Sequence, residues 1–243
     1  MGEAIAVISG KGGTGKTTVC AAVAACLAAG GKRVLCIDAD VGLRNLDIAL
    51  GMADLSVASF ADVIGGRCSL SDAAAHPALP SLFLLTAPIR EECPALDAFA
   101  ALVAQAKQDF DFCLIDAPAG LGEGFRLATC RTDRSLLVAT PDPASVRDAA
   151  HTAELLQRDG KRGLYLVVNR VRPRTFRRLE LTVDDMMDEV GLPLLGVVPE
   201  DSDVLFAAAE GSALIFATDG GAAEACLRIS RRLCGDMLPL MKL

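Results

Sequence analysis

The residues best suited to chemistry form the run Gly10-Lys11-Gly12-Gly13-Thr14-Gly15-Lys16-Thr17-Thr18 near the N-terminus. This run follows a short apolar segment and precedes a helical pattern, which is the context that the phosphate-binding motif G-x-x-x-x-G-K-[ST], or P-loop, requires. Gly10 and Gly15 are expected to take backbone angles that other residues resist, so that N–H groups can face phosphate oxygens. Lys16 is expected to reach the β- and γ-phosphates, and the Thr17 hydroxyl to bind Mg²⁺. We assign all nine residues to nucleotide binding.

Lys11 is a second cation within this loop. The backbone there is already electropositive, so an added positive charge costs stability unless an anion lies nearby. A triphosphate carries about four negative charges. Mg²⁺ and Lys16 supply three positive charges, and Lys11 would supply the fourth. The alternative is a solvated surface lysine.

Carboxylates follow two other apolar segments. Asp38 and Asp40 come after residues 33–37, and Asp116 comes after residues 112–115. Carboxylates at strand ends can serve Mg²⁺ or position water, and an apolar strand ending in Asp is the Walker B pattern. We therefore expect Asp116 near Mg²⁺, with water between them. Helix capping or exposure to solvent is the alternative for Asp38 and Asp40.

Two later segments could hold a nucleobase. Asn169 and Arg170 follow one apolar run, and Pro199-Glu200-Asp201 follows another. An amide side chain can contact a base edge, and the backbone near Pro199 and Glu200 can complete the pocket. The residue types alone leave adenine and guanine open, and Asn169 could instead end its strand as a cap.

The elements that must position these residues are short apolar strands that alternate with helical patterns. Most strands are continuously apolar, which is typical of a parallel sheet covered on both faces. We predict an α/β fold, a doubly wound, mostly parallel sheet of about seven or eight strands with helices on both faces. The expected strands are 4–8, 33–37, 82–86, 112–115, 135–139, 164–168 and 194–198, and the expected helices are 17–29, 95–107, 144–158, 183–190 and 222–233. Ligands bind at the carboxyl ends of such strands, where the polar motifs lie.

Composition limits the class of protein. The 243 residues fit one domain over 1–235 with an apolar tail at 236–243, and the net charge of −7 opposes broad nucleic-acid binding. The N-terminus lacks the features of a secretory signal, so we expect a reducing cytoplasm. The apolar helical run Val19–Ala29 is shorter than the ~20 residues of a membrane span. Nine cysteines form no C-x-x-C motif, and four are expected in the core: Cys20, Cys26, Cys36 and Cys113.

Several of these motifs resemble those of one family. K-G-G-T-G-K-T-T resembles the deviant Walker A motif of the MinD/ParA ATPases. D-A-D-V-G-L-R-N-L-D at 38–47, D-A-P-A-G at 116–120 and T-P-D-P-A-S-V-R-D at 140–148 resemble MinD-type members. N-R at 169–170 and P-E-D at 199–201 resemble the adenine site of the family. The resemblance runs from Ala4 to about Ile215 and implies a P-loop NTPase that uses ATP and Mg²⁺.

The resemblance also implies residue roles. Lys11 would reach across a nucleotide-sandwich homodimer to the partner's phosphates. Asp40 would orient the attacking water, and Asp38 would support the metal site. Two further residues would belong to the switch and partner surface, Gly120 in a mobile loop and Asp148 near the dimer face. Asn45 would contact the phosphate region across the dimer.

The implied function is that of a slow, partner-activated ATPase that acts as a switch in division-site (septum) placement. The implied partners are a second copy of the chain, a MinC-like division inhibitor and a MinE-like or other activator. A ParA-type, DNA-binding segregation ATPase and a flagellar-number ATPase are the alternatives. An electron-transfer protein resembling the nitrogenase iron protein has only the loose spacing of Cys93 and Cys130 in its favour.

Three features stay open at this point. The arginines 170, 172, 174, 177 and 178 form either a solvated loop or a docking surface for anionic lipid, DNA or an acidic partner. MinD proteins usually end in a basic amphipathic helix, whereas Pro239 interrupts the tail here. The tail contacts the inner face of the cell membrane, packs back onto the domain or stays disordered. His76 and His151 are expected to be ordinary polar residues.

Overall fold

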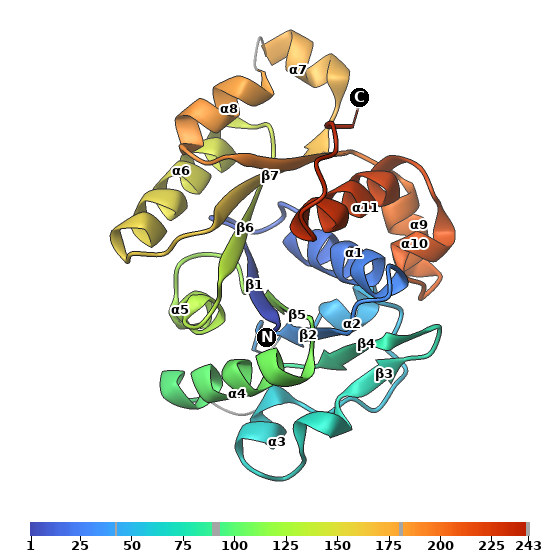
Figure 1. Ribbon diagram of the computed structural model, residues 1–243. Coiled ribbons are helices and arrows are strands. Elements are labelled where there is room, and N and C mark those ends of the chain that lie inside the picture. Colours follow the sequence, from blue (N-terminus) through green and yellow to red (C-terminus); the bar gives the residue numbers. More distant parts are fainter. Residues whose placement is uncertain (42, 89–92, 180–181, 242–243) are drawn as a thin grey trace.

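The fold is built on one eight-stranded sheet (Figure 1). The computed structural model describes residues 1–41, 43–88, 93–179 and 182–241. The strands are β1 (Glu3–Ile8), β2 (Val34–Asp38), β3 (Ala74–His76), β4 (Leu79–Leu85), β5 (Phe112–Asp116), β6 (Arg134–Ala139), β7 (Leu164–Val171) and β8 (Leu194–Pro199). Their order is β3-β4-β2-β5-β1-β6-β7-β8, and only the edge pair β3–β4 is antiparallel. The predicted doubly wound, mostly parallel sheet is confirmed.

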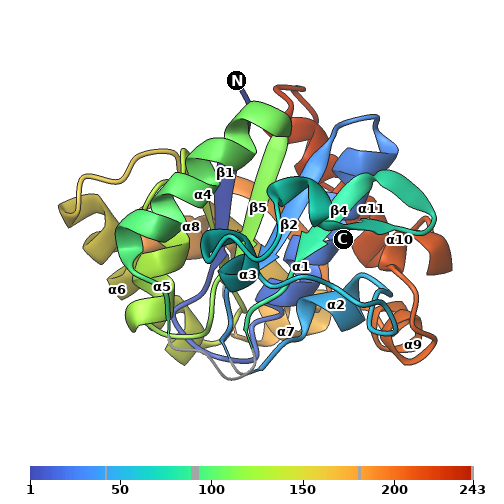
Figure 2. The same cartoon turned by 90° about the horizontal axis from the view of Figure 1, so that it is seen from below.

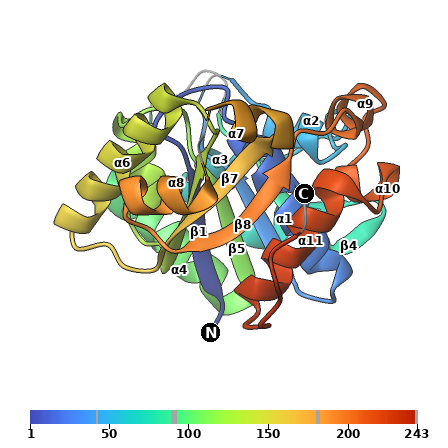
Figure 3. The ribbon, with the colours of Figure 1, turned by 90° about the horizontal axis from the view of Figure 1, so that it is seen from above.

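Helices cover both faces of the sheet, as predicted (Figures 1 and 3). One face carries α1 (Lys16–Ala29), α10 (Leu214–Ala217) and α11 (Gly221–Leu233). The other carries α3 (Phe60–Ile64), α4 (Leu96–Asp109), α5 (Glu123–Thr129), α6 (Pro143–Arg158) and α8 (Val183–Val190). Three short helices lie beyond the carboxyl ends of the strands, on the side opposite the N-terminus (Figure 2): α2 (Leu46–Ala49), α7 (Pro173–Leu179) and α9 (Asp203–Ala209).

The core consists mainly of small and aliphatic side chains. Helix α1 is buried along most of its length because it lies between the sheet and α11. Its alanines and cysteines allow these layers to approach closely. The four cysteines expected in the core, Cys20, Cys26, Cys36 and Cys113, are all buried, which confirms that prediction. An aromatic-poor sequence therefore still builds a dense interior.

The sheet topology directs attention to the end of β1. This strand lies between β5 and β6, and the helices that follow β1 and β5, α1 and α5, cover opposite faces of the sheet. Such a switch point creates a crevice beyond the carboxyl ends of the strands, where ligands bind. The loop from β1 to α1 is residues 9–15, most of the glycine-rich run.

The described part of the tail returns to the domain. Arg232 donates hydrogen bonds of 3.0 and 2.8 Å to the Leu238 carbonyl, and Arg228 donates one of 3.3 Å to the Pro239 carbonyl. Met241 packs against the core cluster that contains α1 and α11. The described tail residues therefore contact the domain, and membrane contact by the tail stays a prediction. Lys242 and Leu243 lie outside the described residues. Among the described residues, no helix combines the length and apolarity needed to cross a bilayer.

Candidate functional site

The glycine-rich loop takes its shape from two left-handed glycines. Gly13 has φ 80° and Gly15 has φ 85°, and Gly15 also precedes the first turn of α1. A Cβ on Gly15 would lie 2.3 Å from Nδ2 of Asn169, so this position excludes any side chain. The prediction for Gly10 needs correction, because its φ is not in the left-handed region. Gly10 is needed for packing instead, since a Cβ there would lie 2.5 Å from the Asp148 carbonyl oxygen.

Three predicted residues meet in a buried charged centre. Lys16 Nζ lies 3.0 Å from Oδ1 of Asp116, and the Thr17 hydroxyl donates to Oδ2 at 2.6 Å. The Lys16 and Asp116 side chains are only 8% and 2% exposed. Burial raises the pKa of Asp116 to about 6, although the Lys16 charge and the Thr17 hydrogen bond oppose it. The centre therefore holds a cation, a hydroxyl and a carboxyl within reach of one ligand.

The loop fits a phosphate and its magnesium ion. The Thr14 hydroxyl oxygen is buried and has no hydrogen-bond partner among the described residues, as expected of a group that meets a ligand. Magnesium in nucleotide sites takes one or two carboxylates together with substrate phosphates. Thr17 and Asp116 provide such a partial donor set. Across the described residues there is no group of three His, Cys, Asp or Glu side chains that could hold a metal by itself.

Asp38 organises the segment that follows β2. One of its carboxylate oxygens accepts from the Asp40 N–H at 2.9 Å, and the other accepts from the N–H groups of Asn45 and Leu46, each at 3.1 Å. Burial raises the pKa of Asp38, while these hydrogen bonds oppose the rise. Asp38 also pairs in register with Asp116 on the neighbouring strand. Its support of a metal site remains a prediction.

Lys11 has a partner that the sequence analysis did not select. Its Nζ lies 2.8 Å from Oδ1 of Asp142. Asp142 caps α6 by accepting from the Ser145 N–H, and it also accepts from the Thr140 hydroxyl at 2.6 Å. Burial raises the pKa of Asp142, but the hydrogen bonds from Lys11, Thr140 and Ser145 outweigh burial, so the pKa is lowered. An acid just before Pro143 was the available signal, since it marks a helix N-cap.

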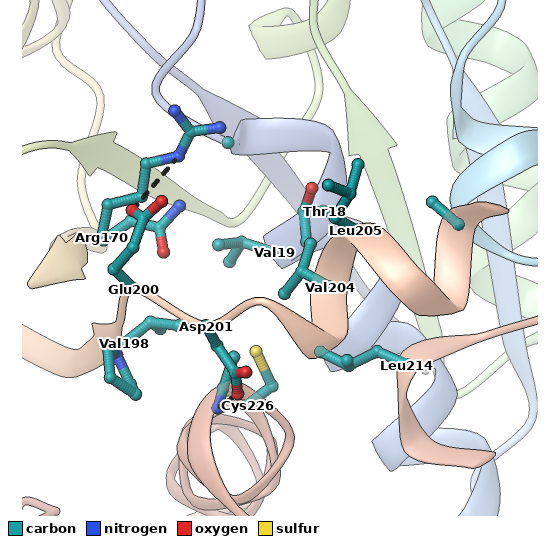
Figure 4. Close-up of a pocket in the computed structure, with 15 residues that line it drawn as sticks. Thr18, Val19, Arg170, Val198, Glu200, Asp201, Val204, Leu205, Leu214 and Cys226 are labelled. Atoms are coloured by element: carbon teal, nitrogen blue, oxygen red, sulfur yellow. Dashed lines mark hydrogen bonds and ion pairs between the residues drawn. The ribbon is translucent and has the colours of Figure 1, made fainter. Parts of the chain in front are cut away.

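Two adjoining cavities lie along the loop. One of about 360 Å³ follows the phosphate loop and includes Asn45. The other, of about 330 Å³, has apolar walls that include Val19, Val204 and Leu214 (Figure 4). Gly15, Thr18 and Arg170 line both cavities. Pro199 and Glu200 line the apolar one, which has the size and lining of a base pocket.

Asn169 joins the base side to the phosphate loop. Its side chain is buried, and Nδ2 donates to the Thr14 carbonyl oxygen at 2.7 Å. A carbonyl oxygen can only accept, so the amide group must face Thr14 with its nitrogen. The amide oxygen and the second amide hydrogen are then left for a ligand in the apolar cavity that Asn169 lines. The Asn169 amide is therefore oriented as well as placed.

Arg170 lies at the mouth of the apolar cavity, beside Glu200 (Figure 4). It is the one non-glycine residue in the described part of the chain with a positive φ, 57°. This conformation costs roughly 1–2 kcal/mol and is often found at functional sites. Arg170 and Arg172 approach the Glu200 carboxylate at 3.9 and 3.6 Å. The expected arginine loop is partly wrong, because residues 173–179 form helix α7, in which the Arg177 side chain lies outside the described part of the chain.

The other predicted residues lie close to this site. Gly120 follows β5 with φ 85° and open space around it. Asp148, in the second turn of α6, packs against Gly10. Asn45 precedes α2 and lines the phosphate cavity. Gly42, within the same segment, lies outside the described residues. All the selected motifs thus gather at the carboxyl ends of the strands.

Known proteins are similar to this chain in sequence and in fold. Residues 5–215 match the model of the CobQ/CobB/MinD/ParA nucleotide binding domain. The chain is 37% identical to the septum site-determining protein MinD of Synechocystis over 246 residues, covering 99% of this chain and 92% of that protein. The chain belongs to the MinD family. A second MinD protein, from Bacillus subtilis, is 35% identical and is covered to 93%.

Solved MinD structures have the same architecture. The MinD chain of the MinC:MinD cell division protein complex from Aquifex aeolicus superposes with a TM-score of 0.92, at 34% identity and 98% coverage of that chain. The Pyrococcus horikoshii MinD protein, solved in complex with Mg-ADP, gives 0.84 at 28% identity and 96% coverage. A ParA family ATPase from Chlorobium tepidum gives 0.84 at 20% identity, which shows a shared fold. The MinD/ParA resemblance found in the sequence is confirmed.

Proposed function

We propose that this protein is a MinD-type ATPase whose ATP-dependent dimerisation controls division-site placement by recruiting a division inhibitor. The observation that carries the proposal is the buried centre of Lys16, Thr17 and Asp116 in a chain that matches septum site-determining proteins over nearly its whole length. A ParA-type role is the alternative, but the ParA family ATPase from Chlorobium tepidum is only 20% identical. The protein would act in the cytoplasm.

The chain's own residues can hold the triphosphate in place for hydrolysis. The loop N–H groups and Lys16 would bind the β- and γ-phosphates, so Lys16 would exchange Asp116 for a stronger anion. Thr17 and Asp116 would hold Mg²⁺, which when bound supplies positive charge that neutralises the phosphates. Asp40 would orient the attacking water, on a segment that Asp38 fixes through backbone hydrogen bonds. Lys11 from the second subunit would add charge at the γ-phosphate.

The orientation of Asn169 favours ATP over GTP. One N–H of its amide nitrogen is held by the Thr14 carbonyl, and we propose that its oxygen accepts from the base. An acceptor pairs with the 6-amino group of adenine but not with the 6-carbonyl oxygen of guanine. The proposed substrate is therefore ATP, with magnesium as its ion.

This base contact predicts a specific thermodynamic cycle. Purine riboside triphosphate, which lacks the amino group, should bind the wild-type protein about tenfold more weakly than ATP, a loss of about 1.4 kcal/mol. In Asn169→Ala the two nucleotides should bind equally, whatever the substitution does to the loop through Thr14. Calorimetric titration of each nucleotide into the wild-type protein and into Asn169→Ala measures the coupling free energy between the amide and the 6-amino group. Equal affinities in the wild-type protein would exclude Asn169 as the base-reading residue.

The dimerisation switch is tested most directly with Asp40→Ala. With ATP and Mg²⁺ this variant should bind nucleotide, form a particle of twice the 25.3 kDa monomer mass and remain in that state. Its turnover should fall by about 10²–10⁴ because the water is no longer oriented. Light scattering measures the mass, and phosphate release measures turnover; wild-type protein with ADP is the monomer control. Normal turnover would remove Asp40 from the mechanism. If the protein stays a monomer with a non-hydrolysable ATP analogue, the dimerisation switch itself is refuted.

Partner binding separates the MinD role from the ParA alternative. The ATP-bound Asp40→Ala dimer should retain a MinC-type division inhibitor, and a MinE-type activator should stimulate the wild-type ATPase. The arginines around α7 favour the alternative, for which ATP-dependent DNA binding would weaken steeply with salt. Sedimentation with anionic liposomes would show whether the tail leaves its position against Arg232 and contacts lipid.

A further inference from the structure

His76 is not the ordinary polar residue that the sequence suggested. It ends β3, is 6% exposed, and uses both ring nitrogens. Nδ1 accepts from the N–H groups of Ala78 and Leu79, each at 3.1 Å, and Nε2 lies 2.9 Å from the Leu50 carbonyl oxygen. N–H groups only donate and a carbonyl only accepts, so the ring is neutral with its hydrogen on Nε2. The surrounding backbone therefore selects one protonation state.

The Leu50 carbonyl lies directly after the single-turn helix α2. Asp38 holds the other end of α2 through the N–H groups of Asn45 and Leu46. The Asp40 N–H donates to the same Asp38 carboxylate, so Asp40, proposed to orient the attacking water, is tied to the start of α2. Asn45 and two residues of α2, Ile48 and Ala49, line the phosphate cavity. A four-residue helix has little stability of its own. Its position must therefore come from Asp38 at one end and from His76 and apolar packing at the other.

His76 also contacts the helices beside the base cavity. Its ring stacks on Phe216 of α10, with centroids 5.9 Å apart and planes 30° apart. Gly51, which follows Leu50, packs so tightly that a Cβ there would lie 2.6 Å from the carbonyl oxygen of Gly211, between α9 and α10. Leu214 of α10 lines the base cavity. We call His76, Leu50 and Phe216 the His76 clasp, because they join the sheet edge, α2 and α10.

We propose that His76 is a positioning residue for hydrolysis, whose neutral ring fixes the end of α2 and so the Asp40 segment, and that protonation of Nδ1 releases it. The proposal rests on the proposed function, because Asp40 matters only if ATP is hydrolysed. A proton on Nδ1 would face the two N–H donors of Ala78 and Leu79, so the ring would have to move. The same movement would break the bond to Leu50.

The charges around the clasp favour the neutral ring. The hairpin 74–85 and helix α10 contain no charged residue, although Glu210 and Asp219 flank α9 and α10. Asp47 on α2 is already paired with Arg44 at 2.9 Å. Burial lowers the pKa of His76, and the hydrogen bond to Leu50 only partly offsets this. The clasp therefore contributes stability fully above about pH 6.5, the ordinary histidine pKa, and loses it as the pH falls through the lowered folded-state pKa.

Nuclear magnetic resonance can test the clasp without nucleotide, since the chain has only two histidines. In ¹⁵N-labelled protein, His151→Gln assigns the His76 ring. The expected ring is the Nε2–H tautomer at neutral pH, with a pKa below about 6.5. Amides of residues 45–52 should exchange faster once the ring is protonated, after correction for intrinsic rates. The other tautomer, or exchange that does not follow the ring titration, would overturn the clasp.

Two substitutions separate the halves of the ring. His76→Gln can still donate to Leu50 but cannot titrate, whereas His76→Asn can still accept from Ala78 and Leu79 but cannot reach Leu50. At pH 7.5 His76→Asn should lower kcat about tenfold, with KM for ATP changed less than threefold, because small misplacements of catalytic groups cost rate. His76→Gln should retain more activity, and its rate relative to wild type should rise as the pH falls from 7.5 to 5.5. His151→Gln should follow the wild-type profile.

The outcomes distinguish this proposal from the proposed function. A folded His76→Asn protein with wild-type kcat would refute the positioning role while leaving the ATPase intact. A constant ratio of His76→Gln to wild-type activity across pH would refute release by protonation. A wild-type protein without ATPase activity would refute the proposed function and with it the positioning role, whereas the tautomer and amide exchange would still report on the clasp. Circular dichroism would verify that both variants are folded.

Discussion

Lys16→Ala is expected to abolish ATP binding, with a loss of at least about 10³-fold, or about 4 kcal/mol. Lys16 is the buried cation of the phosphate loop, and its ammonium group lies within 3.0 Å of Asp116. In the variant, a triphosphate would meet a buried carboxyl with no adjacent cation to offset repulsion. Titration calorimetry of the nucleotide-free protein with Mg-ATP measures the effect.

The same substitution should change how stability depends on pH. Burial raises the pKa of Asp116 to about 6 even with Lys16 beside it, so removing Lys16 should raise this pKa further. A carboxyl whose folded-state pKa exceeds its unfolded value stabilises the fold below the unfolded pKa and loses that contribution as the pH rises through the folded pKa. Lys16→Ala should therefore melt at a higher temperature near pH 5 than near pH 8, relative to wild type.

A matched control is available at the far edge of the sheet. Lys32 follows α1, away from the phosphate loop, and Lys32→Ala removes the same charge from the chain. This variant should bind ATP as the wild type does. Retained ATP affinity in a folded Lys16→Ala protein would contradict the phosphate-loop assignment.

The long helices and strands were predictable because they contain enough residues for a pattern of apolar residues to be recognised. Helices α1 and α6 have 14 and 16 residues, and the central strands are continuous apolar runs. Helices α2 and α10 have four residues each and β3 has three, which is too few to show a period. Packing decides these pieces. The missed elements α2, α9 and α10 nevertheless form much of the wall of the candidate site.

In the candidate site, too, contiguous sequence patterns were predictable and contacts made by packing were not. Contiguous motifs identified Lys16, Thr17 and Asp116, which the fold brings together. Contacts between distant segments were not predictable, because no local pattern connects Lys11 with Asp142 or Asn169 with Thr14. Gly10 shows a subtler limit. A glycine required for close packing and one required for its backbone angle look identical in a sequence.

Lys11→Ala is expected to spare ATP binding by the monomer but to prevent dimerisation. Hydrolysis should fall by about 10³–10⁵, the effect of removing a cation supplied by a partner subunit in related phosphoryl-transfer systems. In the protomer Lys11 lies at the rim of the site, 33% exposed and paired with Asp142 rather than with Asp116. Its side chain can therefore move away from Asp142 toward the phosphates of a partner subunit. Light scattering with a non-hydrolysable analogue measures the dimer, and calorimetry measures nucleotide affinity.

Asp142→Asn provides the opposite change at the same contact. Asparagine still caps α6, so the helix is retained, but the acid that holds Lys11 is lost. A half-exposed ion pair contributes little, so the free energy needed to move Lys11 to a phosphate is small already. Asp142→Asn should lower it further and shift dimerisation to lower protein concentration, by up to about threefold. If Lys11→Ala dimerised like the wild type, both expectations would fail together, because Lys11 would then have no role beyond its contact with Asp142.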